Sequence, residues 1–329
     1  MNVLVTGGAG YIGSHTCVAL LEAGHSVVIA DNFSNSRRDT VERIERLGGR
    51  SVKLVEGDVA DERTVRELFE QNAIDGVIHF AGLKSVPESV AQPLRYYRNN
   101  VFSTVLLAAA CIEHGVGKFV FSSSATVYGS NDVPYREEME PRTPTSPYGS
   151  TKLASERILT ETAASAPGFA VTLLRYFNPI GAHPSGLIGD DPNGVPNNLM
   201  PYITRVARGK LEKLKVYGND YPTPDGTGVR DYIHVCDLAE GHIAALEHAR
   251  PGTQVYNLGS GSGVSVLELV EAFERVNGVK IPYEFAPRRP GDLPAYYADA
   301  SRAERELGWS AKRGVDEMVR DAWNFERKL

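Results

Sequence analysis

Short runs of apolar, mostly β-branched residues alternate along the chain with longer amphipathic stretches. The runs that we predict to form strands are residues 3–5, 27–30, 52–55, 76–80, 119–121 and 170–174. Helical patterns lie between them, at residues 11–23 and near residues 61–70, 95–113 and 148–164. Such alternation is typical of βαβ units around a parallel sheet. The pattern therefore predicts an α/β fold with a doubly wound parallel sheet.

The regular alternation breaks down after Asn178. Residues 179–228 are rich in Gly, Pro, Asn and Asp, and the tail from Pro282 is again rich in Pro and Gly. Between them, residues 229–248 indicate a strand followed by a helix. A long loop-rich insertion is more often functional than idle. We expect one domain over residues 1–178, to which residues 229–260 return, and a smaller loop-rich lobe over residues 179–329 that covers a substrate.

Net charge and cysteine usage narrow the class of protein. The formal net charge is −6 and basic residues are scattered, so neither nucleic acid nor an anionic membrane is an expected partner. Cys17, Cys111 and Cys236 are isolated, which is poor material for disulfides or a metal site and fits a reducing compartment. No apolar run approaches the length of a membrane span, and no targeting segment precedes the first strand. We expect a cytoplasmic protein.

A glycine-rich turn follows the first predicted strand. Residues 6–13 read Thr-Gly-Gly-Ala-Gly-Tyr-Ile-Gly. Gly7 permits the tight turn, Gly10 lets the backbone approach a pyrophosphate, and Gly13 allows the helix to pack closely on the sheet. Phosphates bound there meet the positive end of the helix. The turn predicts a Rossmann-type site for a nicotinamide dinucleotide.

Acidic residues follow the next two strands. Asp31 ends the second strand, where a carboxylate can bind the adenosine ribose hydroxyls and repel a 2′-phosphate, which favours NAD over NADP. Arg37 and Arg38 favour NADP, because nearby arginines can bind a 2′-phosphate, unless they belong to a solvated loop. We give Asp31 more weight in this choice because it occupies the strand end itself. Two interpretations of Asp58 are equally consistent with its position: it contacts the adenine edge, or it is only a turn residue.

A tyrosine and a lysine lie four residues apart on one predicted helical face, as Tyr148 and Lys152. A phenol with a pKa near 10 is a poor base at neutral pH. A nearby ammonium and a cationic nicotinamide both favour the phenolate, so the pair makes a usable base. Ser124 adds a hydroxyl at the carboxyl end of a strand, where ligands bind in such sheets. These residues predict a catalytic site beside the cofactor.

The glycine spacing, Ser124 and the Tyr148–Lys152 pair resemble the extended short-chain dehydrogenase/reductase family. Longer strings are similar to one branch of it, the UDP-glucose 4-epimerase family. They are residues 77–84, 121–129, 174–179, 197–201, 228–235 and 288–296. The resemblance extends over nearly the whole chain.

This resemblance implies a reaction. Tyr148 would take the proton of the sugar 4-hydroxyl while C4 gives a hydride to the nicotinamide. Ser124 would bond the same oxygen, and Lys152 would bind the nicotinamide ribose and hold the tyrosine pKa down. The resulting 4-keto sugar would turn over and take the hydride back on its other face. UDP-galactose and UDP-glucose are the implied substrates, and NAD would stay tightly bound.

The resemblance also implies the residues that hold the cofactor. Lys84 matches a lysine that reaches the nicotinamide end. The implied cofactor-binding residues are Gly7, Gly10, Tyr11, Ile12, Gly13, Asp31, Asn32, Asn35, Ser36, Asp58, Val59, Phe80, Ala81, Gly82, Lys84, Asn99, Ser122, Tyr148, Lys152 and Phe177.

A second set of residues is implied for the UDP-sugar. Arg230 and Arg289 match diphosphate contacts, since guanidinium forks pair well with phosphate oxygens. Tyr296 matches the residue that borders the sugar 2-position, where a bulky ring crowds an N-acetyl group. Asn198 is also consistent with a loop residue whose side chain bonds its own turn. Tyr217 is also consistent with a core residue. The implied substrate-binding residues are Lys84, Ser124, Tyr148, Asn178, Asn198, Leu199, Lys215, Val216, Tyr217, Arg230, Arg289, Asp292 and Tyr296.

Other functions fit less well. Nucleotide-sugar 4,6-dehydratases carry acidic residues just after the catalytic serine or threonine, whereas this chain has Ala125 and Thr126 there. Decarboxylases of UDP-glucuronate are disfavoured by the same observation, though less decisively. A non-enzymatic NAD-binding protein has usually lost the Tyr–Lys pair that is present here.

The histidines do not indicate a metal site. His79 and His234 fit satisfied core residues, and His183 has no second ligand at a useful spacing. The resemblance implies a homodimer, for which the helices near residues 95–113 and 148–164 are suitable candidates.

Overall fold

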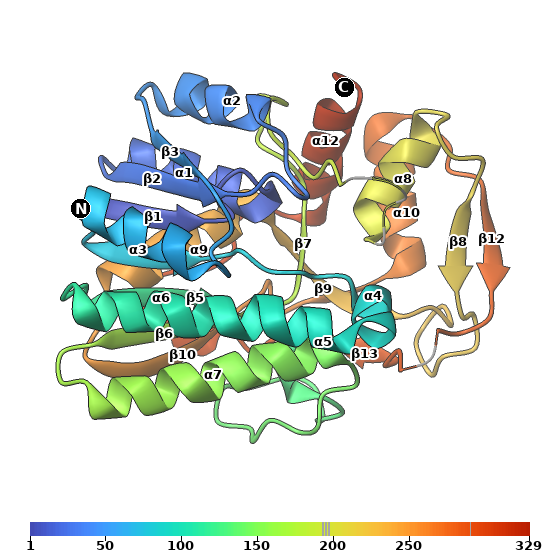
Figure 1. The fold of residues 1–329 in the computed structure, drawn as a ribbon. Coiled ribbons are helices and arrows are strands. Elements are labelled where there is room, and N and C mark those ends of the chain that lie inside the picture. Colours follow the sequence, from blue (N-terminus) through green and yellow to red (C-terminus); the bar gives the residue numbers. More distant parts are fainter. Residues whose placement is uncertain (193, 195, 197, 290) are drawn as a thin grey trace.

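A seven-stranded parallel sheet forms the centre of the structure (Figure 1). The computed structural model describes residues 1–192, 194, 196, 198–289 and 291–329. Across the sheet the strands lie in the order β10 (Gly252–Leu258), β6 (Ala170–Tyr176), β5 (Lys118–Ser122), β4 (Gly76–His79), β1 (Asn2–Thr6), β2 (Ser26–Asp31) and β3 (Lys53–Glu56). Every neighbouring pair is parallel. The predicted α/β fold is confirmed, and the strand order reverses between β1 and β4, where such sheets bind ligands.

Successive residues of each inner strand are buried on opposite faces of the sheet. In β1, Val3 and Val5 join one core cluster, whereas Leu4 joins the other. The first cluster includes side chains of α1 (Tyr11–Glu22), α2 (Asp39–Gly48), α9 (Val235–Glu247) and α11 (Ser301–Leu307). The second includes those of α3 (Glu62–Gln71), α6 (Phe102–Glu113) and α7 (Pro147–Ser165). Burial on both faces explains the continuous apolar strands.

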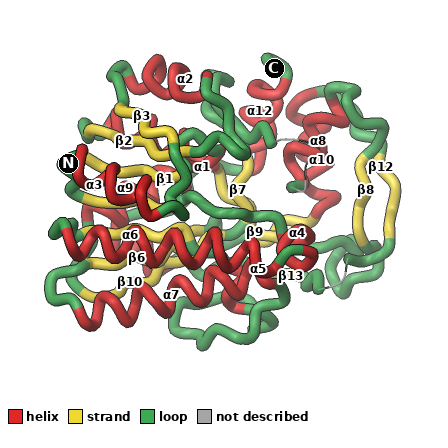
Figure 2. The backbone as a smooth tube through the Cα atoms, viewed as in Figure 1, coloured by secondary structure: helices red, strands yellow, loops and turns green. Residues whose placement is uncertain are grey.

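Short helical elements connect β4 to α6, and β5 to α7. The first connection contains α4 (Val86–Ala91), α5 (Pro93–Tyr96) and a π-helical turn, η1 (Tyr97–Val101), that runs directly into α6. The second contains a 3₁₀ turn, η2 (Ala125–Tyr128). Figure 2 shows α6 and α7 side by side along the same face of the sheet. Among the described residues, no helix combines the length and the apolar character that a membrane crossing requires.

A second group of elements packs around its own core cluster. Its helices are α8 (Leu199–Ala207), α10 (Val266–Asn277) and α12 (Val315–Glu326). Strand β9 (Val229–His234) pairs with β7 (Asn178–Ile180), β11 (Gly263–Ser265) and β13 (Ala295–Tyr296). A separate pair joins β8 (Leu214–Tyr217) to β12 (Tyr283–Ala286).

Regular structure is therefore more extensive than the pattern indicates after residue 178. The stretch 179–228 contains α8 and β8, and the tail from Pro282 contains β12, β13, α11 and α12. Most of these elements are too short to show a period of their own, and β13 has two residues. Pairing with distant segments stabilises them, so composition alone predicts loops.

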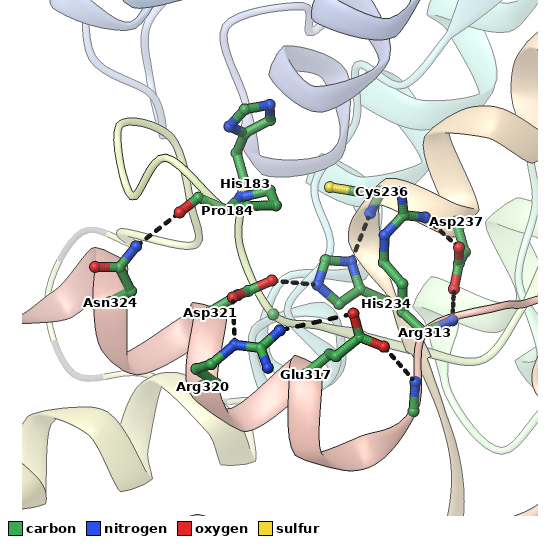
Figure 3. A network of polar contacts seen from close by, with 12 residues as sticks. His183, Pro184, His234, Cys236, Asp237, Arg313, Glu317, Arg320, Asp321 and Asn324 are labelled. Carbon is green, nitrogen blue, oxygen red and sulfur yellow. Dashed lines mark hydrogen bonds and ion pairs between the residues drawn. The ribbon is translucent and has the colours of Figure 1, made fainter. Parts of the chain in front are cut away.

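A buried polar network ties the start of α9 to α12 (Figure 3). His234 is fully buried and caps α9, because its Nδ1 accepts a hydrogen bond of 3.0 Å from the Cys236 amide. Its Nε2 lies 3.3 Å from Asp321 Oδ2, which assigns the proton to Nε2. Arg320 Nε reaches the other oxygen of Asp321 at 3.3 Å. As expected, His234 is a satisfied core histidine.

We predict that His234→Ala lowers the free energy of unfolding by about 2–4 kcal/mol, because it removes a helix cap and leaves a buried carboxylate short of one donor. Thermal unfolding followed by calorimetry measures the effect as a drop of several degrees in Tm. The matched control is His248→Ala, since that histidine is exposed and bonds only the Ala244 carbonyl of its own helix. Equal Tm values for the two variants would contradict the role given to the network.

Candidate active site

The glycine turn joins β1 to α1 and has no room for a side chain at Gly7 or Gly13. Gly7 has φ +69°, and a Cβ there would lie 2.9 Å from the Ala81 nitrogen. A Cβ on Gly13 would lie 2.2 Å from the Gly7 carbonyl oxygen. Helix α1 has Gly10 as its N-cap and no side-chain capping bond. The first amides of α1, at Tyr11 and the following residues Ile12 and Gly13, are therefore available to an anion.

Asp31 is held beside this turn at the end of β2. Its Oδ2 accepts a hydrogen bond of 3.0 Å from the Ala9 amide. Its Oδ1 accepts from the Phe33 amide at 2.9 Å and from the Ser36 hydroxyl at 2.8 Å. The carboxylate is thus oriented by three donors, and each of its oxygens retains capacity for a further donor.

The two arginines that follow are engaged with carboxylates. Arg37 Nη1 lies 3.1 Å from Asp191, and its Nε lies 3.5 Å from Asp39. Arg38 pairs with Glu56. Both are exposed, so these pairs contribute little stability. They nevertheless satisfy the two guanidinium groups without a 2′-phosphate.

Asp58 forms a turn bond and reaches the loop after β2. Its Oδ1 accepts from the Ala60 amide at 2.9 Å, and its Oδ2 lies 3.3 Å from Asn32 Nδ2. Val59 is buried in the core, and Asn35 is exposed. The structure therefore places the expected adenosine-side residues around one loop.

The loop after β4 is fixed by a residue that the sequence patterns did not single out, Asn100. The Asn100 side chain accepts from the Leu83 amide at 2.8 Å and donates to the Leu83 carbonyl at 3.0 Å. It also donates to Thr151 Oγ1 on α7 at 3.2 Å. The Ala81 amide donates to the Thr6 carbonyl at 3.1 Å, beside the glycine turn. This loop contains the expected cofactor residues Phe80, Ala81, Gly82 and Lys84.

Asn99 and Asn100 lie in the π-helical turn η1. Such turns occur frequently at functional sites, because they redirect side chains out of the regular helical register. The only sequence signal for them is a pair of asparagines within an otherwise amphipathic stretch. That signal was insufficient to predict what Asn100 contacts.

Helix α7 carries Tyr148 and Lys152 toward the ends of the strands. Ser146 caps the helix, since its hydroxyl accepts from the Gly149 amide at 3.3 Å. Lys152 Nζ donates to the Ser122 carbonyl at the end of β5, at 2.6 Å, and lies 6.0 Å from the centroid of the Tyr148 ring. The expected Tyr–Lys pair therefore lies at the carboxyl edge of the sheet, with Lys152 buried and Tyr148 partly exposed.

Ser124 lies just beyond β5 and caps the turn η2. Its oxygen accepts from the Thr126 amide at 3.2 Å and from the Thr126 hydroxyl at 3.0 Å. Its hydroxyl also acts to lower the pKa of Tyr148. The Ser122 hydroxyl is bonded to the Tyr176 hydroxyl. The structure thus brings Ser122, Ser124, Tyr148 and Lys152 together.

Burial shifts the titration of both α7 groups away from their charged forms. It raises the pKa of Tyr148 to about 12, a shift that the hydrogen bond from Ser124 opposes. It lowers the pKa of Lys152 to about 8, while Glu156 acts to raise it. The expectation that Lys152 lowers the tyrosine pKa finds no support in this geometry, because its ammonium is directed at the Ser122 carbonyl. An added positive charge would be needed to make the phenol a base at neutral pH.

Two arginines and two aromatic rings gather around Asp292. Arg289 Nε lies 2.9 Å from Asp292 Oδ2, and Arg230 Nη2 lies 3.9 Å from Asp292 Oδ1. The Arg230 guanidinium is 4.5 Å from the centroid of the Tyr296 ring, and that of Arg289 is 5.0 Å from the Tyr217 ring. This cluster of five residues is suited to bind phosphate oxygens and a planar base.

The remaining expected substrate residues are less closely grouped. Asn178 Oδ1 is buried without a hydrogen-bond partner among the described residues. Asn198, at the N-cap of α8 before Leu199, is exposed and lies 3.5 Å from Asp190, which is also 4.0 Å from Lys84. On β8, Lys215 is exposed, Val216 is buried in the core, and Tyr217 is 40% exposed. The Phe177 ring lies 6.1 Å from that of Tyr296.

Comparison with known proteins gives close relatives over the full length. Residues 4–322 match the sequence model of a family described as GDP-mannose 4,6 dehydratase. The UDP-glucose 4-epimerase of Bacillus subtilis (strain 168) is 56% identical over 328 residues, which are 99% of this chain and 97% of the relative. That of Erwinia amylovora is 55% identical over 329 residues, covering 99% and 98%.

Solved structures agree with these relatives. UDP-glucose 4-epimerase from Bifidobacterium longum, in complex with NAD+ and UDP, has a TM-score of 0.97 at 52% identity and covers 100% of this chain and 98% of its own. UDP-glucose 4-epimerase from Stenotrophomonas maltophila, with bound NAD and formylated UDP-arabinopyranose, has a TM-score of 0.97 at 50% identity, with 100% and 98% covered. The chain therefore belongs to the UDP-glucose 4-epimerase family, whose members are NAD-dependent isomerases and form a branch of the extended short-chain dehydrogenase/reductases.

Proposed function

We propose that this protein interconverts UDP-galactose and UDP-glucose at C4 of the sugar, with a tightly held NAD. The observation that carries the proposal is the meeting of Tyr148, Lys152 and Ser124 at the carboxyl edge of the sheet, where Lys152 bonds the Ser122 carbonyl and Ser124 acts on the pKa of Tyr148. Tyr296 also acts on the pKa of Tyr148, and its ring lies against Arg230, so the phenol and the arginine cluster share one site. The ligands of the two solved relatives support this assignment.

The residues present fit NAD. The glycine turn leaves the first amides of α1 open, Asp31 stands beside it, and Arg37 and Arg38 are paired with carboxylates. This arrangement favours NAD over NADP, because the Asp31 carboxylate would repel a 2′-phosphate. When bound, NAD supplies a hydride acceptor and a positive charge next to the phenol. We propose that the sheet domain holds it and that the loop-rich part binds the UDP-sugar.

The chain's own groups move the proton. Tyr148, as the phenolate, accepts the proton of the sugar 4-hydroxyl; loss of the C4 hydride, for which bound NAD would be the acceptor, completes the oxidation to a 4-keto sugar. Tyr148 returns the proton after the sugar has turned over and C4 has regained the hydride. Ser124 bonds the same sugar oxygen and keeps it within reach of the phenol. Lys152 places a cation beside the ring and orients the cofactor ribose. Arg230 and Arg289 hold the diphosphate, so that the sugar is tethered while its face changes.

Dehydration is the nearest alternative, since the matched family description names a dehydratase. Elimination of water needs a further acid/base pair near the hydroxyl groups. The two residues after Ser124 are Ala125, which is buried, and Thr126, whose hydroxyl donates to Ser124. Neither is a carboxylate, so epimerisation is the better supported reaction.

We predict that Tyr148→Phe lowers kcat by about 10²–10⁴-fold, because it removes the proton acceptor and keeps the ring. The assay follows conversion of UDP-galactose to UDP-glucose without added NAD. Tyr283→Phe is the matched control, since Tyr283 is exposed on β12. Full activity of the Tyr148 variant would show that the assigned base is wrong.

Tyr296 is expected to restrict the sugar 2-position. The wild-type protein should turn over UDP-galactose and UDP-glucose well and UDP-N-acetylglucosamine poorly, because the ring occupies the space of an N-acetyl group. Tyr296→Cys should raise the relative kcat/KM for the N-acetyl sugar about 10-fold or more, the order expected when a pocket gains room for a small group. A panel of four nucleotide sugars measures this ratio. Comparable turnover of UDP-N-acetylglucosamine by the wild type would refute the assignment.

We also propose a homodimer formed through the α5–α6 face. Large apolar side chains are exposed there, with Leu94 82% accessible and Phe102 and Ile112 each 44%. Exposed apolar patches of this kind usually mark an interface. Two copies packing α6 and α7 together would cover them.

Leu94→Glu combined with Phe102→Glu should convert the dimer to a monomer, because both charges would be buried between copies. Light scattering after size exclusion measures the mass. The control is Phe285→Glu, which changes an exposed ring on β12. A wild-type protein that is monomeric at micromolar concentration would overturn the proposed interface.

A further inference from the structure

A buried ion pair lies behind the proposed catalytic residues. Glu156 on α7 and Arg175 on β6 are 4% and 5% exposed. Arg175 Nε and Nη2 donate to the two Glu156 oxygens at 2.9 and 2.6 Å, a bidentate arrangement. The guanidinium also lies 4.8 Å from the centroid of the Tyr128 ring. No step proposed above uses this pair.

Three consecutive serines connect the pair to the site. The Ser122 carbonyl accepts from Lys152 Nζ, the Ser123 hydroxyl donates to Glu156, and Ser124 faces Tyr148. Glu156 follows Lys152 by one helical turn on the same face of α7. The carboxylate therefore holds the end of β5 against the inner face of α7.

The same carboxylate is the anion that acts on Lys152. Among the described residues, His79 on β4 and Tyr148 on α7 also interact with this lysine, and Tyr176 on β6 bonds the Ser122 hydroxyl beside it. Burial lowers the pKa of His79 to about 3 and raises those of both tyrosines, so all three are neutral near pH 7. Glu156 raises the pKa of Lys152, against the effect of burial. Arg175 binds both Glu156 oxygens.

We infer that Glu156 is a positioning residue that keeps the Lys152 ammonium charged and holds the Ser122–Ser124 segment against α7, and that Arg175 fixes the Glu156 side chain in this place. The effect of this arrangement on turnover rests on the proposed function. Its effect on Lys152 itself does not, because it is a property of the folded chain alone.

Glu156→Gln tests the inference through the pH profile of kcat. Loss of the anion lets Lys152 lose its proton at lower pH, so the alkaline limb should move to lower pH by on the order of one unit. The variant should therefore lose several-fold more activity at pH 8 than at pH 6, and lowering the pH should restore part of it. A loss by the same factor at every pH would mean a merely structural role and would overturn the inference.

A second readout needs no turnover. Lys152 has a lower pKa in the folded protein than the ordinary 10.5 of an unfolded chain, so its charge penalises folding below about pH 8. That penalty disappears, and stability rises, as the pH increases from about 8 to 10.5. In Glu156→Gln the rise should begin at lower pH, as measured by denaturant unfolding of the protein freed of cofactor. An unchanged onset would refute the electrostatic tie, whereas absent epimerase activity in the wild type would refute only the proposed function.

Glu156→Gln leaves the buried Arg175 without its partner, so the variant can fail to fold. Glu156→Gln combined with Arg175→Met removes both charges and should show the same acid-ward shift, because Glu156 is the group that acts on Lys152. A wild-type alkaline limb in the double variant would overturn the inference.

The matched control is Glu326→Gln. Glu326 is also buried, at 2% exposure, and its carboxylate lies 3.0 Å from Lys210 and 3.4 Å from Arg208 in the other core. The Glu326→Gln variant should have a lower Tm than the wild type and an unchanged alkaline limb in its pH profile of kcat. If it moved the limb equally, the shift would be a general effect of losing a buried carboxylate, and the assignment to Glu156 would fail.

Discussion

A parallel sheet covered by helices on both faces binds its ligands at the carboxyl ends of its strands, where the strand order reverses. The features of the site described above follow from that constraint. The glycine turn follows β1, Asp31 ends β2, the loop fixed by Asn100 follows β4, and the serines end β5. Residues that lie far apart in the chain share one edge, because every strand points the same way.

At this edge of the sheet, nearby charges decide the protonation states of Tyr148 and Lys152. Lys152 is buried and Tyr148 is partly buried, and loss of contact with water favours the neutral form of each. A phenol and an amine in that condition have little use as a proton acceptor and a cation. Their chemistry therefore depends on compensating charges, one from the bound cofactor and one, by our inference, from Glu156. The buried Glu156–Arg175 pair has a position that a stability argument alone does not explain, since such pairs often cost as much as they contribute.

The arginine cluster depends on a second buried carboxylate. Asp231, next to Arg230 on β9, is fully buried and accepts from the amides of Ser260, Gly261 and Ala298 at 2.8, 3.1 and 3.0 Å. It thereby joins β9 to the segment that carries Tyr296. The arginine side of the candidate site is thus assembled from several short strands that have no stability in isolation.

Local features of the sequence were enough for the fold class, the glycine turn and the Tyr148–Lys152 pair. Each depends on residues within one strand, one turn or one helical turn, whose spacing has a direct geometric meaning. Tertiary structure alone decided which distant groups meet: Asn100 with Leu83, Glu156 with Arg175, and Arg230 and Arg289 with Asp292. It also decided that Lys152 bonds the Ser122 carbonyl and leaves the Tyr148 phenol neutral. Sequence periodicity cannot show these pairings, because they join segments whose separation along the chain is unrelated to their distance in space.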